Sequence, residues 1–334
     1  MLPVNEEIRW GIVGPGRIAD KVVRDFAHVD GAEVVAVGSR SAERAQEFAS
    51  RHGVARAYGS YRDLLADPDV DVLYVATTHA QHHALAMGAL HAGKALLVEK
   101  SFTSTAAGAQ EIVDLARRTG IFVMEGIWTR FMPAIVTLRE LIADGAIGEV
   151  RAVQAELGSL WSFDPTHRLF DPAVGGGALL DMGVYTVAFA QMLLGNPESV
   201  TAHGSTFPTG VDADAGLLLG FSGGRYALLT VSLRYRLPGE ARVIGTKGWI
   251  DVHPRFHQPD GFVLHREGAE PETFTRPRLG GGYAHELIEV TECLRAGRLE
   301  SAVMPLADTL AIQTVLGEAA EQLGVRHAED TTVL

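Results

Sequence analysis

The stretch Arg9-Trp10-Gly11-Ile12-Val13-Gly14-Pro15-Gly16-Arg17-Ile18-Ala19 decides the fold class of this chain. An apolar run ends in Gly14-x-Gly16-x-x-Ala19 and leads into a helical pattern, which is the strand, glycine turn and helix of a dinucleotide-binding unit. Gly14 allows the tight turn, and Gly16 lets the backbone approach a pyrophosphate. The new helix directs unpaired N–H groups at the phosphates. The residues predicted to bind here are Gly14, Gly16, Arg17 and Ile18; a tight turn without a ligand is the alternative.

Short apolar strands alternate with helical patterns from residue 8 to residue 125. After the first strand we expect strands at 33–38, 70–76, 95–98 and 121–124, and helices at 42–52, 84–92 and 106–118. This alternation predicts a parallel sheet covered on both faces, with ligands beyond the carboxyl ends of its strands. The polar residues at those ends are predicted to bind the cofactor: Thr77, Thr78, His79, His82, Glu99 and Lys100.

The rhythm changes after about residue 125. We expect strands at 151–157, 200–204, 215–221, 225–233, 241–245 and 248–252, with one substantial helix at 178–194. Short turns between strands predict a second, α+β domain with a largely antiparallel sheet. Helical patterns return at 284–296 and 305–324. The predicted domains are 1–127 for dinucleotide binding, 128–304 for the α+β domain, and 305–334 for a C-terminal helix and tail that pack back on the first domain.

Composition narrows the class of protein. The chain has 334 residues, of which 47% are hydrophobic and 21% charged, as in ordinary globular proteins. A net charge of -12 argues against nucleic acid or an anionic membrane as a partner. No uninterrupted apolar run reaches about 18 residues, so we expect no membrane span. The only cysteine is Cys293, which excludes a disulfide framework and favours a reducing compartment, with the cytoplasm as the expected location.

The end of the second strand, Gly38-Ser39-Arg40-Ser41, predicts which nicotinamide cofactor is used. NAD-preferring units carry a carboxylate here for the ribose hydroxyls, and this stretch has none. Ser39 and Ser41 can donate to a 2′-phosphate, and the Arg40 guanidinium can pair with it. We therefore predict NADP, with NAD as the alternative; a solvated arginine before a helix is the simpler interpretation.

The chain resembles the glucose–fructose oxidoreductase/inositol dehydrogenase (Gfo/Idh/MocA) family. The likeness rests on the turn at 11–16, on Glu99-Lys100, and on Gly175-Gly176-Gly177-Ala178-Leu179-Leu180-Asp181-Met182-Gly183-Val184-Tyr185. Three further stretches resemble its branch of dimeric dihydrodiol dehydrogenases and NADP-dependent D-xylose dehydrogenases: Tyr58-Gly59-Ser60-Tyr61, Glu125-Gly126-Ile127-Trp128-Thr129-Arg130-Phe131 and Gly245-Thr246-Lys247-Gly248. The likeness spans nearly the whole chain.

The resemblance implies a Rossmann domain followed by a domain whose open sheet often forms a homodimer interface. It implies reversible hydride transfer between a nicotinamide and a carbinol carbon of a sugar, cyclitol or trans-dihydrodiol. The catalytic lysine of the family's Glu-Lys-Pro motif matches Lys100, and its catalytic aspartate and tyrosine match Asp181 and Tyr185. The chain departs from the motif at Ser101, where the family usually has a proline that is often cis, so the rigidity of that turn is in question.

Hydride removal from a carbinol leaves a proton on oxygen, so the site needs a base. A tyrosine near its usual pKa of about 10 is a poor base at neutral pH, and an adjacent ammonium such as Lys100 would lower that value. Asp181 and Tyr185 are four residues apart, hence on one helical face, where Asp181 can hold the hydroxyl or Lys100. We favour Tyr185 over Lys100 as the proton carrier. The structural alternatives are an ion pair with Glu99 for Lys100, a helix cap for Asp181 and a core aromatic for Tyr185.

Residues beyond the last Rossmann strand could line a substrate site. The candidates are Trp128, Arg130, Phe131, the loop residues Phe163, His167 and Arg168, and Tyr283 after a glycine run. His79, His82 and His83 suggest a metal, but no acidic or thiolate partner stands at ligand spacing, so we expect none. The rival functions are a keto-sugar reductase, including one for nucleotide-linked sugars, and a nicotinamide-binding sensor without turnover.

Overall fold

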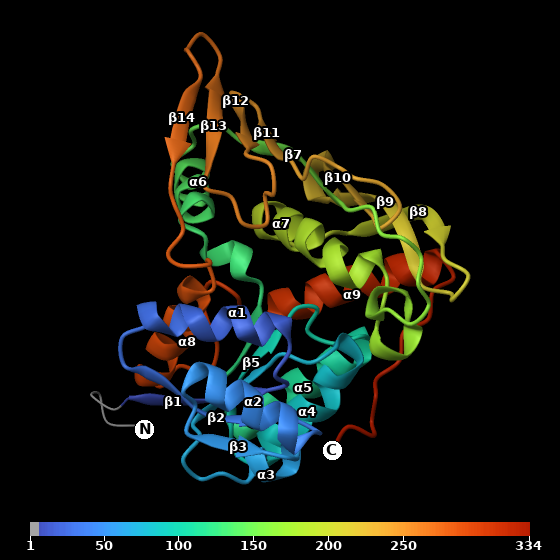
Figure 1. Cartoon of the computed structure of the whole chain (residues 1–334). Helices are drawn as coiled ribbons and strands as arrows, with labels where there is room; N and C mark the ends of the chain where they lie inside the picture. The colour runs from blue at the N-terminus through green and yellow to red at the C-terminus, as the bar shows by residue number, and fades with distance from the viewer. Residues whose placement is uncertain (1–6) are drawn as a thin grey trace. The chain divides into compact units, whose positions relative to one another are not determined.

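The computed structural model describes residues 7–334, and the chain divides into two compact units (Figure 1). The first unit holds the described residues up to Gly126, together with Leu279–Thr309 and Ala328–Leu334. The second holds Ile127–Arg278 and Leu310–His327. This grouping differs from the predicted 128–304 and 305–334, because the chain returns to the first unit at residue 279. Residues 1–6 of the predicted first domain lie outside the described residues.

The first unit contains a six-stranded parallel sheet in the order β3-β2-β1-β4-β5-β6. Its strands are β1 (Ile8–Val13), β2 (Ala32–Gly38), β3 (Arg56–Tyr58), β4 (Val72–Val75), β5 (Ala95–Glu99) and β6 (Val123–Gly126). The order reverses at β1, which confirms the predicted Rossmann fold and puts the ligand crevice beyond the carboxyl ends of β1 and β4. The short strand β3 was not predicted.

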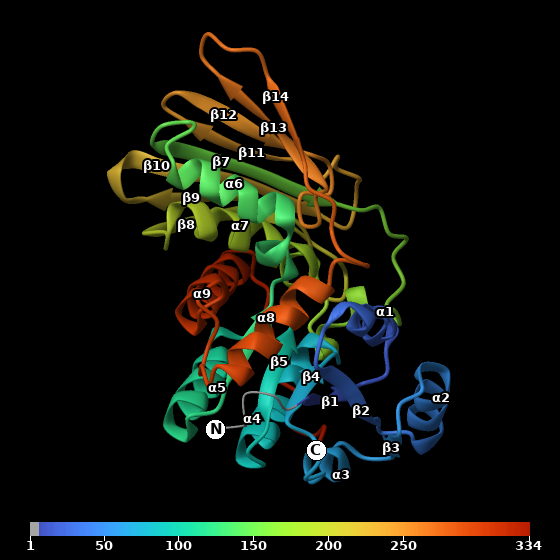
Figure 2. The same cartoon turned by 90° about the vertical axis from the view of Figure 1, so that its left-hand side faces the viewer.

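Helices cover both faces of this sheet. They are α1 (Arg17–Asp25), α2 (Ala42–His52), α3 (Tyr61–Leu65), α4 (His79–His91), α5 (Ala106–Thr119) and α8 (Ala284–Arg295). Because parallel strands need right-handed crossovers, α1 and α2 lie on one face, and α3, α4 and α5 on the other. Figure 2 shows α1 and α2 to the right of the central strands, and α4 and α5 to the left.

One buried carboxylate attaches the returning segment to the first unit. Asp25, at the end of α1, is 4% exposed. Its Oδ1 accepts from the N–H of Gly281 at 2.8 Å, and its Oδ2 accepts from Tyr283 at 2.8 Å and Ala284 at 3.1 Å. These N–H groups stand at the amino end of α8, where a negative charge is stabilised by the helix dipole. These hydrogen bonds therefore hold the end of α1 to the start of α8, although the residues involved are 256 to 259 positions apart in the chain.

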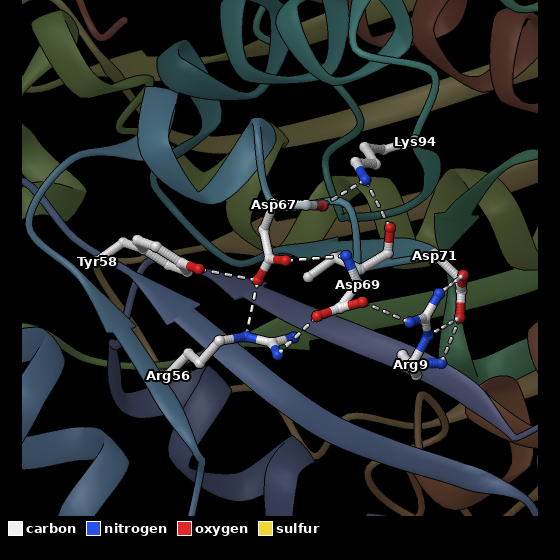
Figure 3. A network of polar contacts seen from close by, with 8 residues as sticks. Arg9, Arg56, Tyr58, Asp67, Asp69, Asp71 and Lys94 are labelled. Carbon is white, nitrogen blue, oxygen red and sulfur yellow. Dashed lines mark hydrogen bonds and ion pairs between the residues drawn. The ribbon is translucent and has the colours of Figure 1, made fainter.

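A polar network holds β1, β3 and the segment before β4 together (Figure 3). Arg9 pairs with Asp71 at 2.9 Å and Asp69 at 3.1 Å, and Arg56 pairs with Asp67 at 2.9 Å. Tyr58 Oη donates to the Asp67 carboxylate at 3.0 Å. Lys94 Nζ donates to the carbonyl oxygens of Asp67 at 2.6 Å and Val70 at 2.8 Å. The network joins the amino ends of β1, β3 and β4, and it includes none of the residues predicted to bind the cofactor.

The second unit contains an eight-stranded sheet in the order β14-β13-β12-β11-β7-β10-β9-β8. Its strands are β7 (Val150–Gly158), β8 (Ser199–Thr206), β9 (Asp212–Phe221), β10 (Arg225–Ser232), β11 (Ala241–Gly245), β12 (Gly248–Val252), β13 (Gly261–Arg266) and β14 (Glu272–Thr275). All neighbours are antiparallel except β7 and β10, which run parallel. This confirms the largely antiparallel sheet; β13 and β14 were not predicted.

Helices pack on one face of that sheet, and both views show α6 (Pro133–Ala143) and α7 (Val184–Leu194) on the same side. The helix α9 (Leu306–Gln322) continues into this unit, where Gln322 bonds the backbone of β8. The segment Pro172–Leu194 is long and apolar enough to cross a membrane by composition, although the sequence analysis expected no such segment. However, 72% of it is buried inside the protein, as in a core helix.

The opposite face of the sheet exposes large apolar side chains. In β9, Ala213, Ala215, Leu217 and Leu219 are buried and the alternate residues point outward, as the two-residue period of a strand requires. Leu218 on β9 pairs with Leu228 on β10, and these are 46% and 44% exposed. Tyr226 and Trp249 add two aromatic rings, 42% and 40% exposed.

Candidate functional site

The turn after β1 has the geometry that a dinucleotide requires. Gly14 has φ +92°, and a Cβ there would lie 2.8 Å from Cγ2 of Thr77. Gly16 is the N-cap of α1, and no side chain caps this helix. The exposed Arg17 and half-buried Ile18 form its first turn. The N–H groups at the start of α1 are therefore left to a ligand or solvent, which suits a phosphate.

The end of β2 holds the three predicted 2′-phosphate ligands. Ser39 is 3% exposed, and its Oγ accepts from the N–H of Ser41 at 3.2 Å. Ser41 caps α2 as expected, its Oγ accepting from Arg44 N at 3.3 Å. Since both oxygens accept from backbone groups, their O–H hydrogens can still donate outward. Arg40 between them is exposed.

The end of β4 contributes two hydroxyls that face into this region. The hydroxyl oxygens of Thr77 and Thr78 are buried and have no hydrogen-bond partner in the protein. Thr78 stands at the N-cap of α4 without using its side chain as a cap. Buried polar groups are normally paired, so two orphaned hydroxyls beside the glycine turn fit a polar ligand such as a dinucleotide.

His82 is fully buried and connects two segments of the site. One ring nitrogen lies 2.9 Å from the carbonyl oxygen of Ser101 and the other 3.3 Å from that of Thr77. Burial lowers the pKa of His82 to about 4, so the ring is neutral near pH 7. Both ring nitrogens are used by the backbone, so His82 would support the cofactor site by holding the segments at Thr77 and Ser101 and not by touching the cofactor itself. Its neighbour His79 is 6% exposed, with ring centres 5.9 Å apart.

Lys100 follows the end of β5, and the peptide bond to Ser101 is cis although residue 101 is not proline. The Lys100 N–H donates to Oε2 of Glu99 at 3.2 Å. Tyr74 Oη donates to the other oxygen of Glu99 at 2.5 Å. Glu99 is 7% exposed, so its carboxylate is fixed from both sides beneath the lysine backbone.

A second buried acid, Glu286 on α8, escaped the sequence analysis. It is 0% exposed, and neither carboxyl oxygen has a hydrogen-bond partner. A Cβ at Gly126 would lie 3.6 Å from its Oε2, so the group lies against the end of β6. Burial, and then the charges of Glu99 and Asp25, raise the pKa of Glu286 well above its usual value. Burial without a donor thus favours the protonated form of Glu286.

In the second unit, the predicted catalytic pair stands at the start of a long helix. A single π-turn, Leu179–Gly183, precedes α7 and contains Asp181. Arg168 Nη2 lies 3.0 Å from Oδ1 of Asp181, which joins the predicted substrate loop to the predicted catalytic carboxylate. Tyr185, half-buried one turn later, shares the helical face of Asp181. π-Turns inside helices often mark functional positions.

An unpredicted aspartate orients this turn. Asp212, at the start of β9, is 0% exposed and accepts from Leu179 N at 2.6 Å. A Cβ at Gly177 would lie 2.1 Å from its Oδ1, so only glycine fits there. Burial raises the pKa of Asp212 to about 6 against the opposing backbone bonds. Asp212 thus acts on Asp181 and Tyr185 through the backbone, and no local sequence signal distinguishes it from Asp214.

His257 is a third residue that was not predicted from the sequence. Its ring centre lies 5.1 Å from that of Tyr185 and 6.2 Å from that of Trp128. Its carbonyl oxygen accepts from Thr129 Oγ1 at 2.7 Å. The imidazole thus lies between a tyrosine and a tryptophan, where its ring nitrogens could form hydrogen bonds with a hydroxylated substrate. Its only sequence signal was a histidine in a loop rich in proline and aromatic residues.

The remaining substrate candidates are placed differently. Trp128, Arg130 and Phe131 are each less than 9% exposed, and Arg130 donates to Gln191 Oε1 on α7. The loop aromatics are more open: Phe163 is 44% exposed and stacks on Phe207 at 5.6 Å.

His167 stacks on Trp161 with ring centres 5.1 Å apart. Tyr283 belongs to the first unit, where Asp25 holds its N–H. Between residues 7 and 334, no three His, Cys, Asp or Glu side chains group as metal ligands; His83 instead lies 2.8 Å from Glu111.

Comparison with known proteins identifies the family. Residues 8–127 match the GFO/IDH/MocA oxidoreductase family, NAD-binding Rossmann fold, and residues 135–251 match the GFO/IDH/MocA C-terminal domain. This chain belongs to the GFO/IDH/MocA family. It is 40% identical over 337 residues to trans-1,2-dihydrobenzene-1,2-diol dehydrogenase of Mus musculus, covering 97% of this chain and 99% of that protein. The human protein of the same name is 38% identical over 335 residues, with the same coverage.

Solved structures of other proteins share the fold. An aldose-aldose oxidoreductase from Caulobacter crescentus complexed with glycerol is 25% identical, with a TM-score of 0.87 over 96% of this chain and 98% of that one. The 3-ketoreductase KijD10 from Actinomadura kijaniata, in complex with NADP and TDP-benzene, is 26% identical, with a TM-score of 0.83 over 97% and 100%. This GFO/IDH/MocA chain is therefore a dehydrogenase or reductase that acts on hydroxyl groups with a nicotinamide cofactor.

The raised pKa of Glu286 can be tested by its effect on stability. Its raised pKa means that the folded protein keeps a proton that the unfolded chain releases above about pH 4.3, so stability falls as pH rises. Glu286→Gln has no proton to release in this range. The free energy of unfolding should therefore fall less steeply with pH in this variant, by up to about 1.4 kcal/mol per pH unit. Chemical denaturation between pH 5 and 8 measures it, with Glu292→Gln on the exposed side of α8 as control. An equal slope in wild type and Glu286→Gln would show that Glu286 is ionised in the fold.

Proposed function

We propose that this chain is an NADP-dependent dehydrogenase that transfers a hydride between the nicotinamide and a carbinol carbon of a sugar, cyclitol or trans-dihydrodiol. The observation that carries this proposal is the pair Asp181 and Tyr185 on one helical segment, with Arg168 on the carboxylate and His257 beside the phenol ring. The names of the dihydrodiol dehydrogenases and the aldose-aldose oxidoreductase support the substrate class. The likeness to a 3-ketoreductase favours reduction of a keto-sugar as the second candidate.

The proposed chemistry divides between three side chains. When bound, the nicotinamide accepts the hydride. Tyr185 takes the proton from the substrate hydroxyl, and Lys100 supplies the positive charge that makes a tyrosine usable as a base near neutral pH. Asp181, fixed by Arg168, holds the substrate hydroxyl in line with Tyr185. The same groups run in reverse for reduction, with Tyr185 donating the proton.

The proposed preference for NADP rests on the end of β2. The described residues from Gly38 to Ser41 contain no carboxylate for the ribose hydroxyls. They do provide two hydroxyls that can donate and an exposed guanidinium. Charge-assisted hydrogen bonds to a phosphate are about twice as strong as neutral ones. A 2′-phosphate would therefore gain more from Arg40 than a ribose hydroxyl would.

Arg40→Ala tests this preference. Loss of a charge-assisted bond should cost about 1.5–3 kcal/mol, which weakens NADPH binding by about tenfold or more. NADH binding should change little, because it lacks the phosphate. Nucleotide fluorescence titrations measure both, with Arg44→Ala as a control that removes an exposed charge one turn further along α2. Equal or tighter NADH binding by the wild type would contradict the proposal.

Tyr185→Phe tests the proton carrier. It removes one hydroxyl and keeps the ring beside His257, so stability and NADP affinity should be preserved while turnover falls by about 100-fold or more. Lys100→Met should be at least as damaging. Reduction of NADP is measured against aldoses, cyclitols and trans-dihydrodiols over a range of pH, with the exposed Tyr235→Phe as control. The wild-type profile should show an ionisation well below about 10 that Tyr185→Phe lacks. Full turnover with an unchanged profile would place the base elsewhere.

We also propose that the chain forms a homodimer through the open face of its eight-stranded sheet. Leu218 on β9 and Leu228 and Tyr226 on β10 make this face apolar over two neighbouring strands, and Trp249 on β12 adds an exposed ring beyond β7 and β11. Contiguous exposed apolar surface of this kind commonly marks a protein interface. The Arg242–Asp251 ion pair on neighbouring strands adds polar groups to the same sheet.

Leu228→Asp tests the dimer. It puts a charge at the centre of the apolar face, so a protein with twice the chain mass at micromolar concentration should become a monomer. Light scattering measures the mass. Val136→Asp, which changes an exposed residue of α6, is the matched control and should leave the dimer intact. A monomeric wild type would refute the dimer, and a dimeric Leu228→Asp would move its interface elsewhere.

A further inference from the structure

The last seven residues, 328–334, form a C-terminal strap across the first unit. Glu329 Oε1 accepts from the N–H and from the hydroxyl of Thr105, both at 2.8 Å, at the amino end of α5. Near the other end, a Cβ at Gly88 on α4 would lie 2.5 Å from a Leu334 methyl, so that methyl packs directly on the helix backbone. Figures 1 and 2 both show the C-terminus beside α3 and α4.

Asp330 is the charged residue at the centre of the strap, and its position is fixed. Its N–H donates to the carbonyl of Ala80 at 2.7 Å, and its Oδ2 accepts from Gln81 Nε2 at 3.2 Å. Its Oδ1 accepts from the N–H and hydroxyl of Thr332, at 3.0 and 2.7 Å. These bonds from Thr332 lower the pKa of Asp330, so the carboxylate is charged near neutral pH. The carboxylate is thus clamped against the first turn of α4.

The first turn of α4 and Arg40 flank the same glycine turn. In the sheet, β2 and β4 are the two neighbours of β1, so the loops at their carboxyl ends lie on either side of the loop after β1. Arg40 follows β2, and Ala80 and Gln81 follow β4. The strap therefore brings a carboxylate to the first turn of α4, beside the glycine turn that would hold the pyrophosphate of a dinucleotide.

Arg40 faces both the strap and α3. Thr332 lowers the pKa of Asp330, and the positive charge of Arg40 lowers it further. Burial raises the pKa of Tyr61 at the start of α3, and the same Arg40 charge opposes this rise. Leu65 at the end of α3 also lies beside Gly88, next to Leu334. Arg40, α3 and the strap are therefore neighbours. Within residues 7–334 Arg40 forms no salt bridge with Asp330, whose oxygens accept from Thr332 and Gln81.

We propose that Asp330 is a specificity-determining residue for the cofactor: a fixed negative charge that opposes binding of a 2′-phosphate by Arg40 and so limits the preference for NADP over NAD. This inference rests on the proposed use of Arg40 as the phosphate ligand. A carboxylate within a Debye length, about 8–10 Å, of a phosphate repels it. The Asp330 carboxylate accepts three hydrogen bonds and its own N–H donates to Ala80, so it cannot swing away. NADH has a hydroxyl at that position and is not repelled.

Asp330→Asn tests the charge while it keeps the size and the Oδ1 acceptor of the strap. NADPH and 2′,5′-ADP should bind about fivefold more tightly than to wild type, and NADH should bind equally well. The gain should shrink in 0.5 M salt, because salt screens the repulsion. Asp144→Asn removes an exposed carboxylate from the second unit and should change neither affinity. Thermal melting checks that both variants keep the fold.

The outcomes separate the inference from the proposed function. A selective gain for NADPH in Asp330→Asn supports the inference even if wild type binds NADH more tightly, a result that would refute only the NADP preference. No change in Asp330→Asn, or an equal change for NADPH and NADH, would overturn the inference while leaving the Arg40→Ala result to decide the cofactor.

Discussion

The close approach of Gly14 to Thr77 is the constraint on which the first unit depends. With φ +92° and only 2.8 Å between a Cβ position and the Thr77 methyl, any other residue would push the β1 turn away from the end of β4. That contact sets the crevice between two strand ends, leaves the start of α1 uncapped, and buries the hydroxyls of Thr77 and Thr78 without partners. The binding geometry is therefore a consequence of one steric fit in the backbone.

Elements with local signals were predictable, and elements held by distant contacts were not. The glycine turn, the cap at Ser41 and the antiparallel strands of the second half follow from turn chemistry and apolar periodicity, which act within a few residues. The short β3 and the edge strand β14 were not predicted because each has few residues and few apolar ones, whereas β13 was not predicted despite its apolar run Phe262-Val263-Leu264. The domain limits differed from prediction because Asp25 captures N–H groups more than 250 residues away. Periodicity carries no information about such a contact.

The same distinction applies to the site. Lys100, Asp181 and Tyr185 were predicted from motifs and remain predictions, whereas no motif pointed to Asp212, His257 or Glu286. Each missed residue acts across a large sequence separation: Asp212 bonds Leu179, and Glu286 lies against Gly126. Asp212 and Glu286 stand out because they are fully buried, which makes an unpaired or charged group costly, whereas His257 stands out by its position between two aromatic rings. Only a three-dimensional structure shows that burial.

Buried carboxyls in this chain divide into two kinds according to what faces them. Asp25 and Asp212 accept backbone N–H groups at the ends of helical segments, where the dipole favours a negative charge. Glu286 faces no donor, and the nearby charge of Glu99 makes a second carboxylate unfavourable. Glu99, by contrast, accepts from Tyr74 Oη and from the Lys100 N–H. Burial raises the pKa of both Asp212 and Glu286, but only Asp212 has backbone donors that oppose the rise, because neither oxygen of Glu286 meets a donor.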